Sequence, residues 1–212
     1  MLDIPMFTTE NGAASLILKE IPYSEAAYIK IQSSQTPEAL LEECVSFCRM
    51  AGAENIYASG HVILEKYPFH TAILEMCCPV GSIPETDAAL FPLQDKTLEI
   101  WRELYNRRMK NVPNFSFMSV LDGKKLIAKG GGYFVHKSGE LLGIGIAGDD
   151  HIDAVASALP GEGETVVRAL CSVLPSDTAV LEVASTNERA IRLYKKMGFI
   201  PTREISRWYK II

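Results

Sequence analysis

The sequence of 212 residues predicts an α/β protein in which strands and helices alternate along the chain. Two observations support this fold class. Apolar residues recur at helical spacing in several segments, which predicts amphipathic helices packed on a core. Between these segments lie short apolar or alternating runs bounded by glycine, proline and aspartate, which are typical of strands and their turns.

The overall composition places the chain among globular proteins. Hydrophobic residues make up 48% and charged residues 22%, which leaves ample apolar side chain for a core. The formal net charge of -5 argues against a nucleic-acid-binding surface, because such a surface gathers positive charge. The sequence holds no apolar run of about 18–20 residues, the length that spans a bilayer, and its start lacks a signal-peptide pattern. We therefore expect a cytoplasmic protein that binds neither nucleic acid nor membrane.

The five cysteines predict neither a metal site nor a disulfide framework. No Cys-x-x-Cys pair is matched by a second such pair or by two close histidines, which is the spacing that zinc ligands need. In a reducing compartment we expect the cysteines to be buried thiols that pack as small apolar side chains.

The first part of the chain predicts three strands and one helix. The strands are expected at 13–21, 26–33 and 54–58. The helix is expected to begin at Thr36-Pro37-Glu38, with the threonine hydroxyl as N-cap and proline in the first turn. Residues 62–80 predict helix or irregular structure, and residues 79–88, with two prolines and a glycine, predict a linker.

The second part predicts four helices and a longer series of strands. Helices are expected at 96–110, 119–129, 163–174 and 187–197, and strands at 132–137, 140–147, 151–158 and 178–184, with two short strand-like pieces in 199–212. Ser119 and Asp122 fit a capping box at the start of the second of these helices.

Two stretches of the chain resemble each other when one is shifted by 123 positions. Residues 28–48 then fall on residues 151–171, with an isoleucine, a serine, a proline and a cysteine matched. The order of elements is also shared, which favours a pseudo-repeat, although four identities alone fit coincidence. The second copy has glycines where the first has glutamate and leucine, and glycine lets a backbone approach a ligand closely.

The junction between the strand at 151–158 and the helix at 163–174 is the main candidate site. Its sequence, LPGEGET, places glycines directly before a helix N-terminus. Exposed backbone N–H groups and the helix dipole suit an anion such as a pyrophosphate at this position. A plain tight turn is the alternative interpretation.

The helix at 187–197 is the second candidate. Asn187 is a suitable N-cap, and Tyr194 lies seven residues further, about two turns along the same helix face. A buried tyrosine needs a partner for its hydroxyl, so Tyr194 is interpreted either as a packed aromatic residue or as a functional one.

These residues belong to a string of the form N-x-x-A-x-x-L-Y-x-x-x-G-F, present here as Asn187, Ala190, Leu193, Tyr194, Gly198 and Phe199. The string resembles the C-terminal motif of the GNAT superfamily of acyl-CoA-dependent N-acetyltransferases, and the resemblance covers about residues 88–212. It implies an α/β (α+β) fold with a mixed, mostly antiparallel sheet flanked by helices. Residues 86–212 are therefore predicted to be a GNAT-like acetyltransferase domain, and residues 1–85 a degenerate GNAT-like half-domain without the glycine loop.

The resemblance also implies where acetyl-CoA binds. The pantetheine arm is expected between the strands at 151–158 and 178–184, paired with the backbone of Val155, Ala156 and Ser157. The pyrophosphate is expected on the loop formed by Gly161, Glu162, Gly163, Glu164 and Thr165. Asn187 is expected to contact the cofactor arm, and Tyr194 to protonate the departing thiolate as general acid.

A general base is expected among three residues near these strands. His151 and Asp153 share one face of their strand by the period-two rule, and Glu182 lies on the strand at 178–184. Each could take a proton from an ammonium group, directly or through water, and each also fits a solvated polar side chain.

The predicted function is acetyl transfer from acetyl-CoA to a primary amine of a small molecule or peptide, by direct attack and without a metal. The glycine loop departs from the usual Q/R-x-x-G-x-G/A, because Pro160 takes the first position and Thr165 the last. Two acids, Glu162 and Glu164, also lie beside the expected pyrophosphate. A non-catalytic acyl-CoA sensor and a partner-binding module are therefore alternatives, and an edge strand could pair two copies as a homodimer.

Overall fold

The computed structural model describes residues 5–212 and contains two compact units. We call them the N-terminal unit, which comprises the residues up to Ala72 together with Glu204–Ile212, and the C-terminal unit, which is Ile73–Arg203. These limits differ from the predicted domains 1–85 and 86–212. The chain passes from one unit to the other inside two strands rather than through the predicted linker.

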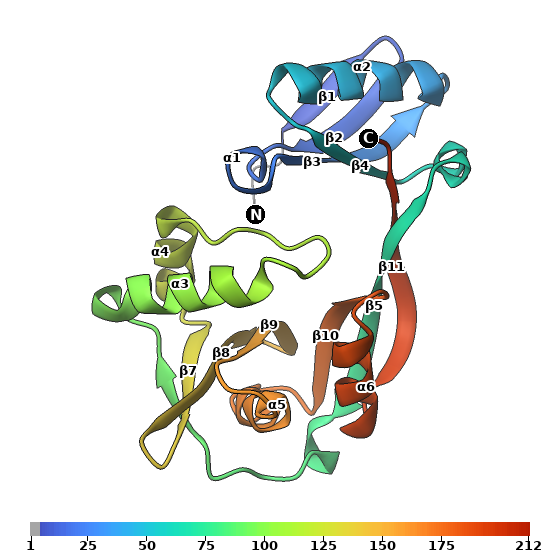
Figure 1. The fold of residues 1–212 in the computed structure, drawn as a ribbon. Helices are drawn as coiled ribbons and strands as arrows, with labels where there is room; N and C mark the ends of the chain where they lie inside the picture. The colour runs from blue at the N-terminus through green and yellow to red at the C-terminus, as the bar shows by residue number, and fades with distance from the viewer. Residues whose placement is uncertain (1–4) are drawn as a thin grey trace. The chain divides into compact units, whose positions relative to one another are not determined.

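The N-terminal unit is a sheet with one long helix on one face (Figure 1). Its elements are β1 (Met6–Thr9), β2 (Gly12–Ile17), α1 (Ile21–Ser24), β3 (Ala26–Ser34), α2 (Pro37–Met50), β4 (Asn55–Ser59), η1 (Val62–Lys66), the start of β5 (Phe69–Pro79) and the end of β11 (Ile200–Lys210). The strand order is β1-β2-β3-β4-β11. Strands β3 and β4 are parallel, and the other pairs are antiparallel.

Helix α2 forms where the sequence predicts it, because its buried leucines and cysteines recur on one face and share a core with β3 and β4. Thr36 is the N-cap residue, but its side chain makes no capping hydrogen bond. Its hydroxyl instead donates to Asn11 Oδ1 at 2.7 Å. The predicted hydroxyl cap is therefore wrong, since a partner distant in the sequence takes up the hydroxyl.

The C-terminal unit is a larger mixed sheet. Its elements are the rest of β5, η2 (Val80–Ser82), β6 (Ala89–Pro92), η3 (Asp95–Thr97), α3 (Leu98–Met109), α4 (Val120–Lys129), β7 (Gly132–Lys137), β8 (Glu140–Gly148), β9 (His151–Ser157), α5 (Gly163–Cys171), β10 (Thr178–Ala184), α6 (Glu188–Lys196) and the start of β11. The strand order is β11-β5-β10-β9-β8-β7-β6. Only β9 and β10 run parallel among the pairs whose register is defined, so the mostly antiparallel sheet is confirmed.

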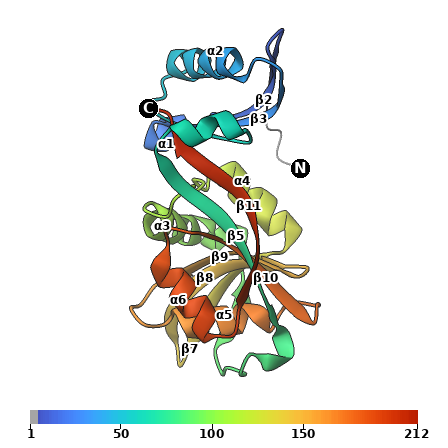
Figure 2. The ribbon, with the colours of Figure 1, turned by 90° about the vertical axis from the view of Figure 1, so that its right-hand side faces the viewer.

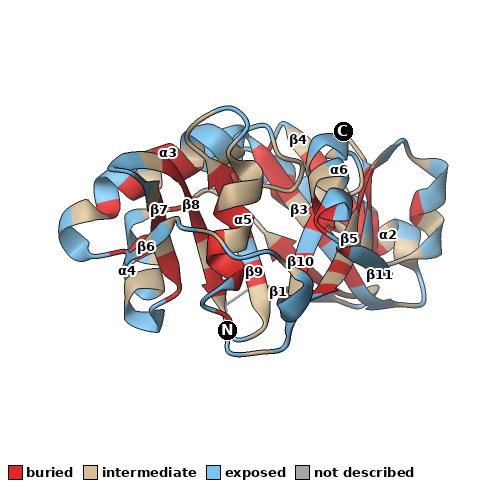
Figure 3. Cartoon of the chain, turned by 90° about the horizontal axis from the view of Figure 1, so that it is seen from below, coloured by how far each residue is buried: buried red, intermediate tan, exposed pale blue. Residues whose placement is uncertain are grey.

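Helices cover both faces of this sheet. Helices α3 and α4 lie on one face and α5 on the other (Figures 1 and 2). Trp101 of α3 shares a core with Ile144 of β8, whereas Leu170 of α5 and Tyr194 of α6 share a second core with Val135 of β7. Figure 3 shows this burial as red segments along the strands and the helix surface that covers them. The strands of the candidate site are thus held between two cores.

Two glycines on β8 allow α5 to lie close to the sheet. A Cβ on Gly145 would stand 2.3 Å from Leu170 Cδ1 and 2.9 Å from the carbonyl oxygen of Ala154. A Cβ on Gly143 would stand 2.7 Å from Val166 Cγ2. Neither position has room for a side chain. Glycine at both positions therefore allows α5 to pack closely against β8.

Two strands differ from the secondary-structure predictions. Strand β5 occupies much of the region predicted as helix or irregular structure, and it pairs with β10 from Ile73 to Pro79. Strand β11 is continuous where two short pieces were predicted. Both strands pair with segments distant in the sequence, and such pairing overrides weak local preference.

The predicted linker at 79–88 belongs to the C-terminal unit alone. Val80, Ile83 and Ala88 pack against its core, and the Val80 amide donates to the carbonyl oxygen of Asp177 at 2.8 Å. The prolines and glycine therefore mark a surface loop of one unit, not a boundary between two.

Replacing Gly145 by alanine is expected to lower the free energy of unfolding by about 1–3 kcal/mol, because the new methyl group overlaps Leu170 and a backbone carbonyl. Urea denaturation followed by circular dichroism measures the change. Gly81→Ala is the matched control, since nothing lies within 4 Å of its Cβ position. Equal stability of the two variants would contradict the close approach of α5.

Candidate functional site

Strands β9 and β10 begin side by side and then separate. They pair in parallel at His151 with Val180 and at Ile152 with Leu181, and at no later position in residues 5–212. Beyond this point β9 keeps only β8 as its partner, while β10 stays paired with β5 to its end. We call the unpaired region between β9 and β10 the strand gap. It is closed at His151 and opens toward the C-terminal ends of both strands.

A β-bulge accompanies this separation. Ile152 and Ala154 face consecutive residues of β8, which leaves Asp153 between them without a ladder partner. Ile152 shares the core of α5, whereas Ala154 shares the core of α3. The alternation of sides is therefore interrupted, and the period-two rule that predicted a shared face for His151 and Asp153 does not apply across the bulge.

The residues predicted to pair with the cofactor arm follow the bulge. Val155 packs toward the core of α5, Ala156 is buried in the core of α3, and Ser157 lies beside the start of α5. Their backbone pairs with β8, and no strand in the described part of the chain pairs with them on the side of β10. An extended ligand could therefore pair with this edge of β9.

The loop after β9 leads into α5 with the geometry of an anion site. Gly161 has a φ of 90°, a left-handed conformation that favours glycine. Gly163 begins α5, so the N–H groups of Gly163, Glu164 and Thr165 lie in its first turn, where no intrahelical carbonyl accepts them. These N–H groups and the helix dipole favour a bound anion.

The acids of this loop differ in their partners. The Glu164 carboxylate accepts hydrogen bonds from Lys196 Nζ of α6, at 2.7 Å, and from Arg168 of α5. The hydrogen bond from Lys196, with that from Arg168, holds the pKa of Glu164 below its ordinary value. The charge of Glu164 is therefore compensated within the protein. Glu162 is the N-cap residue of α5 and makes no side-chain cap hydrogen bond.

Helix α6 contributes the two residues of the predicted string. Asn187 is its N-cap, as predicted, and its Oδ1 accepts a hydrogen bond from the Ala190 amide at 3.2 Å. Tyr194 is 8% exposed, and its ring centre lies 5.8 Å from that of Phe199. Burial raises the pKa of Tyr194 to about 12, so its phenol is protonated at neutral pH. The same core contains Val183 of β10, which borders the strand gap.

The three predicted base candidates differ in their surroundings. His151 Nδ1 lies 2.5 Å from Asp150 Oδ1, and the histidine side chain is 44% exposed. Asp153 is exposed within the bulge. Glu182 is exposed on β10 and lies directly opposite Glu75 of β5. Of the three, His151 is the candidate with a hydrogen-bonded carboxylate that can orient it.

Sequence reasoning missed the polar residues that β5 and β11 bring to this part of the sheet. The Glu75 carboxylate accepts hydrogen bonds from Arg203 Nη2 and from Thr202 Oγ1, both at 2.7 Å. The bond from Arg203, with that from Thr202, holds the pKa of Glu75 below its ordinary value. The apolar run at 72–78, interrupted only by Glu75, was the available signal, although such a run fits a strand or a buried helix.

The strands of the N-terminal unit that correspond to β9 and β10 are β3 and β4, and these do not separate. Strands β3 and β4 pair in parallel at five positions, the last being Lys30 with Ser59. The next residue, Gly60, continues the contact, because a Cβ there would stand 2.3 Å from the carbonyl oxygen of Ile31. The strand gap is therefore a feature of the C-terminal unit, and the N-terminal copy is closed at the equivalent place.

Comparison with solved structures finds the same fold in other proteins. A conserved protein of unknown function from Staphylococcus epidermidis aligns over 99% of this chain and 94% of its own, with a TM-score of 0.64 and 11% identity. A GCN5-related N-acetyltransferase from Kribbella flavida aligns over 98% of this chain and 89% of its own, with a TM-score of 0.60 and 14% identity. A tandem GNAT protein from the clavulanic acid biosynthesis pathway aligns over 94% and 78%, with a TM-score of 0.55 and 14% identity.

The chain therefore has the fold of the GNAT superfamily, which confirms the predicted resemblance at the level of the fold. No protein-family model and no curated protein matches the sequence. Within residues 5–212, no group of three or more His, Cys, Asp and Glu side chains is arranged to hold a metal ion. None of the helices described here has the length and apolar character needed to cross a membrane.

Replacing Glu164 by glutamine is expected to reduce stability at neutral pH more than at pH 3. The folded-state pKa of Glu164 is lowered, so its stabilising effect is present above about pH 4.3, the ordinary glutamate value, and is lost as the pH falls through the folded pKa. Denaturant titrations of both proteins at pH 7 and pH 3 measure the difference. A difference that stays constant with pH would contradict the assigned ion pairs.

Proposed function

We propose that the protein is an N-acetyltransferase that moves an acetyl group from acetyl-CoA to a primary amine by direct attack. The observation that carries this proposal is the strand gap, which opens toward a glycine loop at the N-terminus of α5. A long ligand with an anionic group would be bound by the first turn of α5, while its extended arm would pair with the free edge of β9. CoA, with a pyrophosphate joined to an amide-containing arm, has this chemistry.

The closed end of the strand gap is where an arm entering from the loop would stop. The last shared pair, Ile152 with Leu181, marks this end, and the bulge at Asp153 lies beside it. The reacting thioester would therefore lie near the start of β9, at the opposite end from the glycine loop. This position selects among the candidates for the general base.

His151 best fits the role of general base under this proposal. It is at the closed end of the gap, and Ile152, the next residue, packs toward α5, so His151 faces the side of α3. Asp150 holds its Nδ1, which leaves Nε2 to accept a proton. Asp153 and Glu182 remain candidates that lack such an orienting partner among the contacts of the described chain.

The reaction itself requires three proton transfers. His151 would take a proton from the acceptor ammonium, and the freed nitrogen would form a bond to the thioester carbonyl carbon while the bond from carbon to sulfur breaks. Tyr194 would give its phenolic proton to the departing thiolate, and the second proton of the attacking nitrogen would pass to the Tyr194 phenolate, directly or through water, to leave the neutral amide. The Tyr194 phenol carries its proton at neutral pH, as this role requires, and burial, which raises its pKa, makes it a weaker acid than an exposed tyrosine.

The acceptor would be a cationic amine of a small molecule or a peptide. Glu75 and Glu182 face each other across β5 and β10, and Arg203 is the guanidinium that pairs with Glu75. The exposed Asp153 adds a further negative charge near the closed end of the gap. Such a surface attracts ammonium groups.

Two alternatives remain, because Pro160 offers no side-chain donor and Glu162 adds a negative charge where the loop would bind a phosphate. The first alternative is a non-catalytic acyl-CoA sensor. Acetyl-CoA binding without turnover on any amine would support it. The absence of acetyl-CoA binding at millimolar concentration would instead leave the partner-binding module.

The first functional prediction concerns Tyr194. Acetyl-CoA is expected to raise the melting temperature of the wild-type protein and of Tyr194→Phe alike, because a ligand bound only by the folded state stabilises it. Release of free thiol in the presence of an amine panel is expected to be about a hundredfold slower for the variant, since the general acid is removed. An unchanged rate of thiol release would exclude Tyr194 as the acid.

The second functional prediction concerns His151. His151→Ala is expected to reduce kcat/KM about a hundredfold, and added imidazole is expected to restore part of the rate because it can replace the missing base. Asp150→Asn should cause a smaller loss and change the pH profile, since it alters the orientation of the ring. Asp153→Asn and Glu182→Gln serve as comparisons. If either of these lowers kcat/KM more than His151→Ala does, the base is that residue and not His151.

A further inference from the structure

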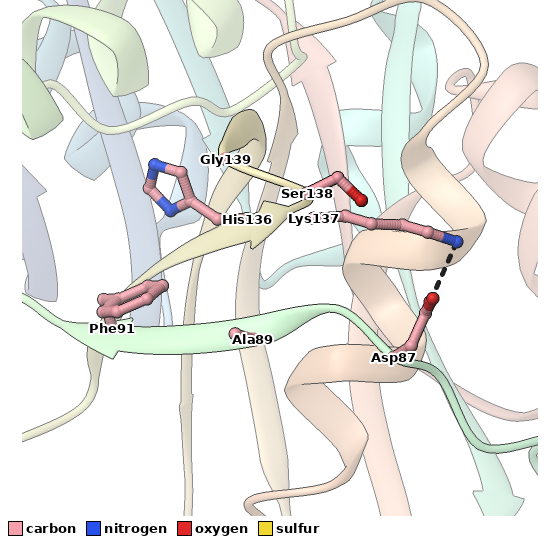
Figure 4. Close-up of a pocket in the computed structure, with 7 residues that line it drawn as sticks. All are labelled: Asp87, Ala89, Phe91, His136, Lys137, Ser138 and Gly139. Carbon is pink, nitrogen blue, oxygen red and sulfur yellow. Dashed lines mark ion pairs between the residues drawn. The ribbon is translucent and has the colours of Figure 1, made fainter.

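A pocket of about 420 Å³ lies where β6 meets the turn between β7 and β8 (Figure 4). Its lining residues are Asp87, Ala89, Phe91, His136, Lys137, Ser138 and Gly139. None of these residues belongs to the strand gap or to the roles proposed above. Strand β6 is at the edge of the sheet, so the pocket is at the margin of the C-terminal unit.

The pocket combines an aromatic wall with polar groups. The Phe91 ring is perpendicular to that of His136, with 5.2 Å between their centres, and Phe91 is 52% exposed. His136 Nδ1 is buried and has no hydrogen-bond partner in residues 5–212. The exposed ring of Phe91 suits a flat heterocycle, which could stack on it.

A cation stands at the rim of the same pocket. Lys137 Nζ lies 2.8 Å from Asp87 Oδ1, as the dashed line in Figure 4 shows. The side chains are 46% and 74% exposed, and an ion pair this exposed contributes little to stability. The ammonium could therefore turn to a bound anion at small cost, while Asp87 keeps it near the pocket in the free protein.

The pocket lies at the same end of the C-terminal unit as the glycine loop. The pKa of Lys137 is raised, mainly by its hydrogen bond to Asp87 and in smaller part by the negative charge of Glu162. Glu162 is the N-cap residue of α5, so the ammonium is within electrostatic reach of the expected pyrophosphate position.

The loop itself supplies no free cation for a phosphate. Pro160 stands where the resemblance would place a glutamine or arginine, and the nearby cations Arg168 and Lys196 are both bonded to Glu164. A multiply charged phosphate ligand would need compensation from elsewhere. Lys137 is a lysine at this end of the unit whose present partner is an exposed carboxylate.

We propose that this pocket holds the 3′-phosphoadenosine end of CoA, with the adenine on Phe91 and the 3′-phosphate on Lys137. This inference rests on the proposed binding of acetyl-CoA in the strand gap. It extends the site from the glycine loop to the edge of the sheet, and it gives the cofactor a cation that the loop lacks.

The test compares CoA with dephospho-CoA, which lacks the 3′-phosphate, by isothermal titration calorimetry. The wild-type protein is expected to bind CoA about tenfold more tightly, and Lys137→Gln is expected to remove that preference by weakening CoA alone. Phe91→Ala is expected to weaken both ligands about tenfold, because both carry the adenine. Lys129→Gln, an exposed lysine at the end of α4, is the matched control and should bind like the wild type.

The outcomes separate this inference from the function on which it rests. If the wild type binds CoA but Lys137→Gln keeps the full preference over dephospho-CoA, or loses affinity for both ligands equally, the 3′-phosphate is not on Lys137 and the inference is overturned while the proposed function stands. Wild-type affinity in Phe91→Ala would likewise overturn the adenine site. If the wild type binds neither ligand, the proposed function and the inference both fall. Melting curves of each variant confirm that it is folded.

Discussion

The early end of the pairing between β9 and β10 is the constraint on which the site depends. Neighbouring strands in a sheet normally stay about 4.8 Å apart, so a break in pairing needs another partner for each strand. Strand β10 finds this partner in β5, which pairs with it from Thr178 to Ala184, while β9 stays with β8. The bulge at Asp153 turns β9 at the same place. Each of the two strands thus keeps its other neighbouring strand after β9 and β10 separate.

The two strand–helix–strand units of the chain show what this separation adds. Tyr28 pairs with Tyr57 in one unit and His151 pairs with Val180 in the other, so the shift of 123 positions seen in the sequence also relates the backbone pairing. The strands pair in the same register in both units. The N-terminal strands stay together as far as Gly60, whereas the C-terminal strands separate. A shared framework therefore produces a closed unit and an open one, and the glycine loop accompanies the open one.

Local patterns in the sequence were sufficient for most of the fold. The capping box predicted at Ser119 and Asp122 is present in both directions, and the strand predicted at 178–184 has these limits. Strand β5 could not be predicted, because an apolar run fits either a helix or a strand until its partner is known. The same contrast between local patterns and long-range pairing applies to the candidate site. The position of Tyr194 on α6 came from a local string. The strand gap depends instead on a bulge, which has no local signal, and on β5, whose local signal is ambiguous.

Strand β5 also explains why the chain cannot be divided at the predicted boundary. A fragment beginning at residue 86 would contain β9, α5 and β10, and with them every residue of the predicted cofactor site. It would lack β5, which is the partner that β10 keeps after it leaves β9. Without that partner, β10 would have unpaired backbone groups on both sides of its C-terminal half, and re-pairing with β9 would be the nearest way to satisfy them. The strand gap would then close. Strand β5 would thus be needed to keep the proposed cofactor site open, although none of its residues is needed to touch the ligand.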